Sequence, residues 1–120
     1  MTVKPIVPRR RADQDANETL DDYVAESSEE TGLRFIDALE SAYGNIGRYP
    51  GIGSLRYAYE LALPGLRSWR LKGFPYLVFY IERDGYIDVW RVLHERRDIS
   101  RWLRETGEAS GDTGSGDSSA

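Results

Sequence analysis

The chain contains no cysteine and only one histidine, His94, and these two shortages exclude several classes of function. Without cysteine it has no disulfide, no thiolate metal ligand and no cysteine nucleophile. One histidine cannot form a multi-histidine metal site. No apolar run approaches the length that spans a membrane, and the N-terminus has no apolar signal core. We therefore expect a cytoplasmic protein with no metal, no cofactor and no contact with a membrane.

The composition is that of one small globular domain with an uneven distribution of charge. The chain has 120 residues, of which 40% are hydrophobic, enough for a single core. Residues 13–40 carry ten acidic residues and one basic residue, whereas residues 41–104 carry eleven basic and six acidic residues. The net charge of −4 and the confinement of basic charge to one region argue against direct binding of nucleic acid.

The last sixteen residues differ in composition from the rest. Residues 105–120 are rich in Gly, Ser and Asp and contain no apolar residue larger than Ala. Such a segment cannot bury enough apolar surface to offset its ordering entropy. We expect a folded domain over residues 1–104 and a disordered tail over residues 105–120.

The spacing of apolar residues predicts two helices between Asp13 and Tyr49. Apolar residues recur every three or four positions, at Ala16, Leu20, Tyr23, Val24, Leu33, Ile36, Leu39, Tyr43 and Ile46. Asp13 is the expected N-cap of the first helix, and the sequence from Ser27 to Glu30 fits a capping box for the second. Pro50 and Gly51 should end the hairpin.

Beyond Gly53 the periodicity predicts strands. Residues 65–71, 76–81 and 86–93 are candidates, and Asp84-Gly85 is a hairpin-turn signal between the last two. Residues 3–8 contain Pro5 and Pro8, which suits an edge strand. The predicted fold class is α+β: an N-terminal edge strand, a two-helix hairpin on one face of a small antiparallel sheet, and a short C-terminal helix around residues 99–103.

The end of the last strand carries a cluster of cations. Arg91, His94, Arg96 and Arg97 stand there within seven residues, followed by Asp98. Together with Arg67, Arg70 and Lys72 they are expected on the sheet face away from the helices, where they could hold phosphate or carboxylate groups. His94 could act as a general acid or base, but a histidine ending a strand more often makes a structural hydrogen bond. Asp98 could simply cap the last helix, and Trp69 and Trp90 could simply pack in the sheet.

Several motifs of the chain together resemble the ParE branch of the RelE/ParE toxin superfamily. The resemblance covers roughly residues 4–104. It rests on Arg91-Val-Leu-His-Glu-Arg-Arg-Asp98, Pro75-Tyr-Leu-Val-Phe-Tyr80, Tyr49-Pro-x-x-Gly53, Leu63-Pro-Gly-Leu-Arg67 and Phe35-Ile-Asp-Ala-Leu39. The resemblance implies the toxin of a type II toxin–antitoxin module with a helical hairpin packed against a small antiparallel sheet. It also implies a ParD-like antitoxin as partner, with an extended C-terminal segment that wraps the toxin and a ribbon-helix-helix domain that binds DNA. DNA would then be contacted only indirectly.

Within that superfamily, ParE-like members inhibit DNA gyrase and RelE-like members cleave messenger RNA. The chain has only two lysines and no tyrosine after Tyr86, which departs from the RelE pattern. The resemblance therefore favours a non-enzymatic toxin that stabilises the cleaved-DNA complex of gyrase, with no catalytic residue of its own. Two alternatives stay open: a metal-independent ribonuclease, and a toxin-fold protein that has lost toxicity and only binds its antitoxin.

Each reading has its own candidate residues. The expected target-binding residues are Arg91, His94, Arg96, Arg97, Arg101 and Trp102. The candidates for contact with an antitoxin are Tyr23, Val24, Tyr43, Arg67 and Arg70. A ribonuclease would use His94, Arg91, Arg70 and Lys72.

Overall fold

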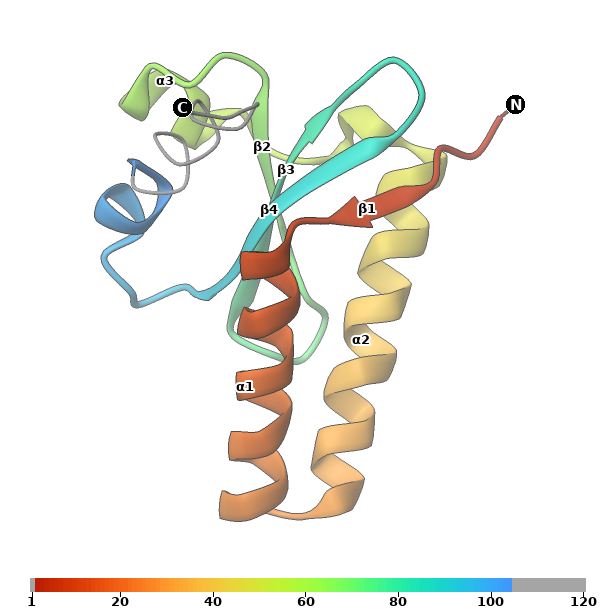
Figure 1. Cartoon of the computed structure of the whole chain (residues 1–120), viewed down its shortest axis with the longest axis vertical. Coiled ribbons are helices and arrows are strands. Elements are labelled where there is room, and N and C mark those ends of the chain that lie inside the picture. Colours follow the sequence, from red (N-terminus) through yellow and green to blue (C-terminus); the bar gives the residue numbers. More distant parts are fainter. Residues whose placement is uncertain (1, 105–120) are drawn as a thin grey trace.

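The computed structural model describes residues 2–104, so the prediction for the tail lies outside the described residues. The elements are β1 (Ile6–Pro8), α1 (Arg10–Glu26), α2 (Glu29–Arg48), η1 (Pro50–Ile52), α3 (Arg56–Leu61), β2 (Leu66–Arg70), β3 (Tyr76–Glu82) and β4 (Ile87–His94). Residues 99–104 are helical as well. The α+β class, the helical hairpin and the short last helix are as predicted (Figure 1).

The four strands form one sheet in the order β1-β4-β3-β2. β2, β3 and β4 are the predicted antiparallel meander. β1 lies at the edge, as its prolines suggest, but it runs parallel to β4 and covers only Ile87 to Val89. The outer edge of β4 beyond Val89 is therefore not covered by a strand.

The long helices begin at positions other than those predicted. α1 begins three residues before Asp13: Arg9 is its N-cap, without a side-chain capping bond. The N-cap of α2 is Ser28, whose hydroxyl accepts a hydrogen bond from the Thr31 amide at 3.0 Å, so the cap lies one residue after Ser27 and the predicted pair of Ser27 and Glu30 does not form it. The α1–α2 hairpin extends beyond the end of the sheet (Figure 1).

The sheet is buried on both faces, because helices cover both. The α1–α2 hairpin packs on one face around Phe35, Leu39, Ile46, Val78, Tyr80, Val89 and Val92. On the other face lies a second apolar cluster of Ala58, Leu66, Phe79, Trp90, Leu93, Ile99 and Leu103. This second cluster contradicts the expectation of an open cationic face on the side of the sheet away from the α1–α2 hairpin.

An irregularity in β4 determines which face each side chain joins. Phe79 pairs with Arg91 and Tyr80 pairs with Val89, so Trp90 is an extra residue on β4. Such a β-bulge interrupts the strict alternation of side chains. Val89 and Val92, three residues apart, consequently lie in the same cluster, which a regular strand does not allow.

The segment between α2 and β2, for which the sequence predicted no element, contains α3. α3 ends at Ala62, which has a left-handed φ of 54°. Ahead of α3, the Tyr80 hydroxyl donates to the Pro50 carbonyl at 2.7 Å and accepts from the Gly53 amide at 3.0 Å. A Cβ at Gly53 would lie 2.7 Å from that hydroxyl oxygen, so the close approach requires glycine.

Candidate functional site

Arg91 is not on an open face but is buried against α1. Its side chain is 2% exposed, and its Nε and Nη2 each donate to the Asp15 carboxylate at 2.8 Å. The same carboxylate accepts the Val92 amide at 3.0 Å. Asp15 therefore occupies the edge of β4 where β1 has ended.

The Arg91 guanidinium also positions the last helix. Its carbon lies 4.8 Å from the centre of the Trp102 ring, and the Arg97 guanidinium lies 5.2 Å from the same ring. At the start of the helix, the Asp98 carboxylate accepts the Arg101 amide at 3.3 Å, as expected of a cap. Residues 99–104 are thus linked through Trp102 and Arg91 to Asp15 on α1.

His94 makes the structural hydrogen bond that was the alternative to a catalytic role. Its Nδ1 accepts the Arg96 amide at 3.0 Å, and its ring lies edge-on to Tyr76 with centroids 5.1 Å apart. Nδ1 is therefore already used as an acceptor, which leaves Nε2 to bind or exchange a proton with another molecule.

The residues of a ribonuclease site are not gathered as a set. Arg70 lies near His94, because Arg70 pairs with Leu77 in β3 and the neighbouring Tyr76 pairs with His94. Lys72 lies beyond the end of β2 and borders a hollow with residues of α2 instead. The Arg70 Nε is 3.2 Å from the Glu95 carboxylate. Arg91, in contrast, is buried in an ion pair with Asp15.

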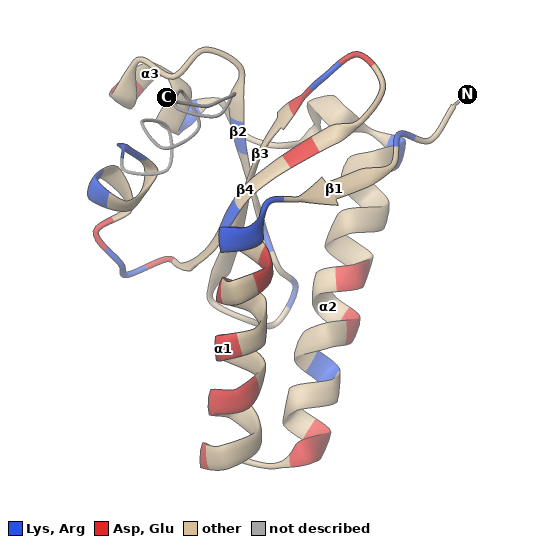
Figure 2. Ribbon diagram, viewed as in Figure 1, with Lys and Arg blue, Asp and Glu red and all other residues tan. Residues whose placement is uncertain are grey.

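The exposed cations of the strand end are Arg96, Arg97, Arg101 and Arg104. They follow one another in the turn after β4 and on the outer side of residues 99–104, to the left of the sheet in Figure 2. Four of the six expected target-binding residues, Arg96, Arg97, Arg101 and the half-buried Trp102, lie in this segment. His94 is half-buried at its beginning.

A groove runs between α1 and this segment. It has a volume of about 270 Å³, and acids of α1 form one wall while Arg97 and Trp102 belong to the other. Tyr76 also borders the groove. Among residues 2–104, no three His, Cys, Asp or Glu side chains are placed to hold a metal ion.

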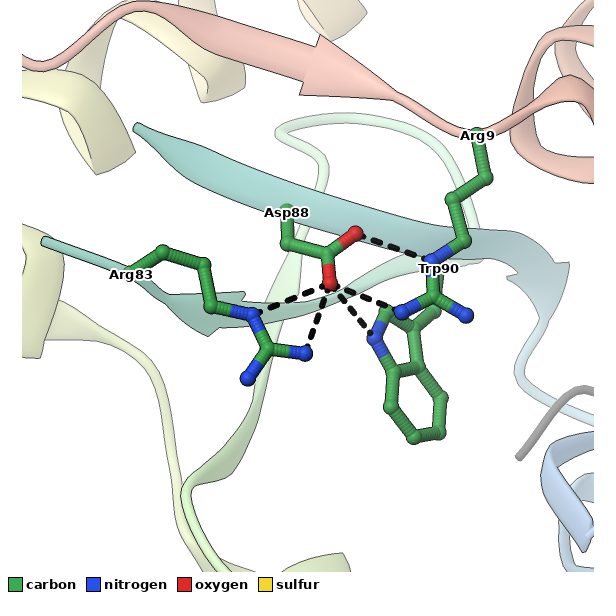
Figure 3. Close-up of polar contacts among 4 residues, drawn as sticks. All are labelled: Arg9, Arg83, Asp88 and Trp90. Atoms are coloured by element: carbon green, nitrogen blue, oxygen red, sulfur yellow. Dashed lines mark hydrogen bonds and ion pairs between the residues drawn. The ribbon is translucent and has the colours of Figure 1, made fainter. Parts of the chain in front are cut away.

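A second arginine–carboxylate cluster was missed in the sequence. Asp88 is buried on β4 and accepts hydrogen bonds from Arg9, Arg83 and the Trp90 indole (Figure 3). Burial raises the pKa of Asp88, but the hydrogen bonds and charges of Arg9 and Arg83 outweigh it and hold the pKa below its ordinary value of 3.8. The Arg9 guanidinium also lies 4.7 Å from the centre of the Trp90 ring. In the sequence, the only sign of this cluster was Asp88, a charged residue within an otherwise mostly apolar strand.

The candidate antitoxin contacts are dispersed. Tyr23 lies in an aromatic cluster with Phe35, Phe74 and Tyr76. Tyr43 is half-buried, and burial together with the charges of Asp13 and Asp15 raises its pKa above the ordinary value of 10.0.

Of the other three candidate antitoxin contacts, Arg67 and Arg70 make polar contacts within the chain and Val24 is exposed. The Arg67 guanidinium donates to the Gly53 carbonyl at 2.8 Å, and Arg70 pairs with Glu95. Val24 is 40% exposed near the tip of the hairpin. Thus Val24 and Arg70 offer the most accessible side chains of the set.

Comparison with known proteins identifies the family. Residues 6–99 match the model of the ParE toxin of type II toxin–antitoxin systems, parDE, which is well over half of the chain. The chain belongs to the ParE toxin family. No curated protein sequence matches it.

A solved structure supports the ParE-like fold. It is described as the chromosomal ParDE TA system from P. aeruginosa, is 18% identical and superposes with a TM-score of 0.64. The match covers 77% of this chain and 96% of that one. In the described part of this ParE-family toxin, no helix is long and apolar enough to cross a bilayer.

Proposed function

We propose that this ParE-family toxin binds DNA gyrase and stabilises the cleaved-DNA complex, and that a ParD-like antitoxin neutralises it. The surface that we assign to the target consists of Arg96, Arg97, Arg101 and Trp102, with His94 at its border. Arg91 holds this surface in place from beneath rather than contacting the target.

One observation carries the proposal: three of the four side chains of the ribonuclease reading, Arg91, His94 and Arg70, make structural contacts. Arg91 is buried on Asp15, and the His94 Nδ1 accepts a backbone amide. The cations that stay exposed lie in one segment that a partner protein could contact. Exposed arginines and a tryptophan are typical of such protein interfaces.

Two observations support an antitoxin as partner. The matched family is that of a toxin in a two-protein system, and the structure with the same fold is described as a ParDE system.

Controlled expression in a bacterium with a DNA-damage reporter tests the target. Gyrase poisoning predicts filamentation and induction of the reporter while translation continues. Immediate loss of translation without a damage signal would contradict the proposal and favour the ribonuclease.

Two variants test which residues act. Replacing Arg96 and Arg97 together by Glu should abolish growth arrest, because it reverses the charge of the proposed surface. The control, Arg34→Glu with Arg48→Glu, makes the same change in charge at two exposed positions of α2 and should stay toxic. Retained toxicity of the first variant would exclude this surface.

His94→Gln separates binding from catalysis. Glutamine keeps a polar acceptor but cannot transfer a proton near neutral pH. We expect toxicity to fall only slightly, measured as the inducer concentration that halves growth. A collapse of toxicity, together with loss of RNA cleavage, would point to a nuclease.

A further inference from the structure

Four exposed arginines after β4 form a cationic surface at one end of the sheet. We call it the strand-end surface, and it consists of Arg96, Arg97, Arg101 and Arg104. These side chains lie in the turn after β4 and on the helix of residues 99–104 (Figure 2). Like charges this close together repel one another, so an anionic ligand stabilises the surface.

The two acids of this stretch are directed elsewhere. The Glu95 carboxylate lies 3.2 Å from the Arg70 Nε. The Asp98 carboxylate accepts the Arg101 amide at 3.3 Å and so caps the last helix. Neither acid is placed to neutralise the turn that follows β4.

Arg97 is held in position by an aromatic ring rather than by a carboxylate. Among residues 2–104, Arg96 and Arg97 form no ion pair, although Glu18 and Asp22 of α1 border the same groove as Arg97. The Arg97 guanidinium lies 5.2 Å from the centre of the Trp102 ring. A guanidinium stacked on an aromatic face keeps N–H donors at its edge for a carboxylate. Binding an anion therefore costs less ordering of this side chain.

Residues 105–120, which we call the acidic segment, follow this surface directly in the chain. They contain no base and four acids: Glu105, Glu108, Asp112 and Asp117. No apolar residue of the segment is larger than Ala, so charge is what it offers to another surface. The eight residues from Arg104 to Asp112 reach at most about 28 Å, whereas the six helical residues 99–104 span about 9 Å. Every arginine of the strand-end surface is within reach of these acids.

The covalent link favours the acidic segment over other anionic occupants. A linked segment acts at an effective concentration in the millimolar range. The acidic hairpin of a second copy also complements the arginines, but it is present only at the concentration of the protein itself. Nucleic acid is disfavoured by Glu18 and Asp22, which line the groove beside Arg97.

We propose that the acidic segment is an intramolecular ligand of the strand-end surface, which an acidic partner must displace. Exposed ion pairs are individually weak and are screened by salt, so the segment competes with a partner without blocking the surface permanently. The contact itself is independent of gyrase. That it weakens binding of the target rests on the proposed function.

An acidic probe measures whether the surface is occupied. Fluorescein-labelled decaglutamate is titrated with the full chain at an ionic strength of about 0.1 M, where charges more than about 10 Å apart are screened from one another. A full-chain variant that neutralises the acidic segment should bind the probe about fivefold more tightly than the wild type, because its arginines are no longer paired. Its substitutions are Glu105→Gln, Glu108→Gln, Asp112→Asn and Asp117→Asn.

The matched control neutralises four exposed acids of the α1–α2 hairpin and so changes the net charge equally. Its substitutions are Asp21→Asn, Glu26→Gln, Asp37→Asn and Glu40→Gln. None of these residues borders the groove beside Arg97, so the control should bind the probe like the wild type. Arg96→Glu with Arg97→Glu should abolish binding of the probe. Circular dichroism checks that each variant is folded.

Backbone NMR provides a readout that needs no probe. Arg96 and Arg97 lie well before the first substituted residue, Glu105. Their amide shifts should differ between the wild type and the neutralised segment at about 0.1 M ionic strength and should coincide at about 1 M, where the ionic contacts are screened.

Three results would overturn the proposal. One is equal affinity of the probe for the wild type and for the neutralised segment. Another is an equal gain in the hairpin control, which would mean an effect of net charge alone. The third is a concentration-dependent dimer in sedimentation that Arg96→Glu with Arg97→Glu abolishes and the neutralised segment keeps, which would assign the surface to a second copy.

Discussion

Two carboxylates, Asp15 on α1 and Asp88 on β4, stabilise the sheet edge through arginine. Asp15 holds Arg91 across 76 positions of the sequence, and Asp88 holds Arg9 across 79. Neither pair follows from local spacing, because each joins elements that meet only in the folded chain. The sequence could indicate that Arg91 was important, but not that it is buried.

Asp88→Asn should destabilise the protein at neutral pH. The substitution removes the charge that Arg9 and Arg83 face, at a cost of about 3 kcal/mol in the free energy of unfolding. Because the folded-state pKa of Asp88 lies below the ordinary 3.8, this stabilisation is complete above that pH and is lost as pH falls through the folded value. Urea unfolding should therefore show a deficit at pH 7 that narrows below about pH 4.

The control for this measurement is Asp84→Asn in the exposed turn between β3 and β4. It removes the same charge but should leave the free energy of unfolding nearly unchanged. A deficit for Asp88→Asn that stayed constant into acid would show that lost packing, not lost charge, is responsible.

Tyr80→Phe tests the two hydrogen bonds by which the Tyr80 hydroxyl holds the loop before α3. The variant leaves the Gly53 amide and the Pro50 carbonyl without their partner, at a cost of about 1–3 kcal/mol. Thermal unfolding should show a lower Tm. Tyr49→Phe, which removes a hydroxyl from a residue that is 55% exposed, should unfold like the wild type.

Among the elements, long periodic ones were predictable and short ones were not. α1, α2 and the three meander strands follow from apolar spacing, because each buries a full face. α3 has only six residues and its place depends on covering the second face of the sheet. The parallel direction of β1 and the bulge at Trp90 depend on partners distant in sequence.

Asp15→Asn tests whether α1 positions the last helix. We expect a loss of about 3 kcal/mol in the free energy of unfolding, because Arg91 is buried and loses the charge that it faces. Hydrogen exchange over residues 99–104 should also become faster, since Arg91 stacks on Trp102. Glu18→Gln, at an exposed acid of the same helix, should change neither. Unchanged hydrogen exchange over residues 99–104 in Asp15→Asn would show that the last helix does not depend on its link to α1.

At the scale of the whole molecule, helices on both faces leave few places for a partner. The sequence predicted a site at the end of β4, and this stays a prediction, but it placed the cations on a sheet face that is in fact covered. What is exposed there is the turn and the helix that follow the strand. The exposure of Leu33 on α2 could not be predicted from the sequence, because a regular apolar stripe predicts that Leu33 is buried.

The most direct test of the proposed function is a cleavage assay with purified gyrase, supercoiled plasmid and ATP. After detergent and protease treatment, the wild type should yield linear plasmid that increases with its concentration, and the Arg96→Glu, Arg97→Glu variant should yield none. The Arg34→Glu, Arg48→Glu control should behave like the wild type. Absence of linear plasmid at any concentration of folded wild type would contradict gyrase as the target.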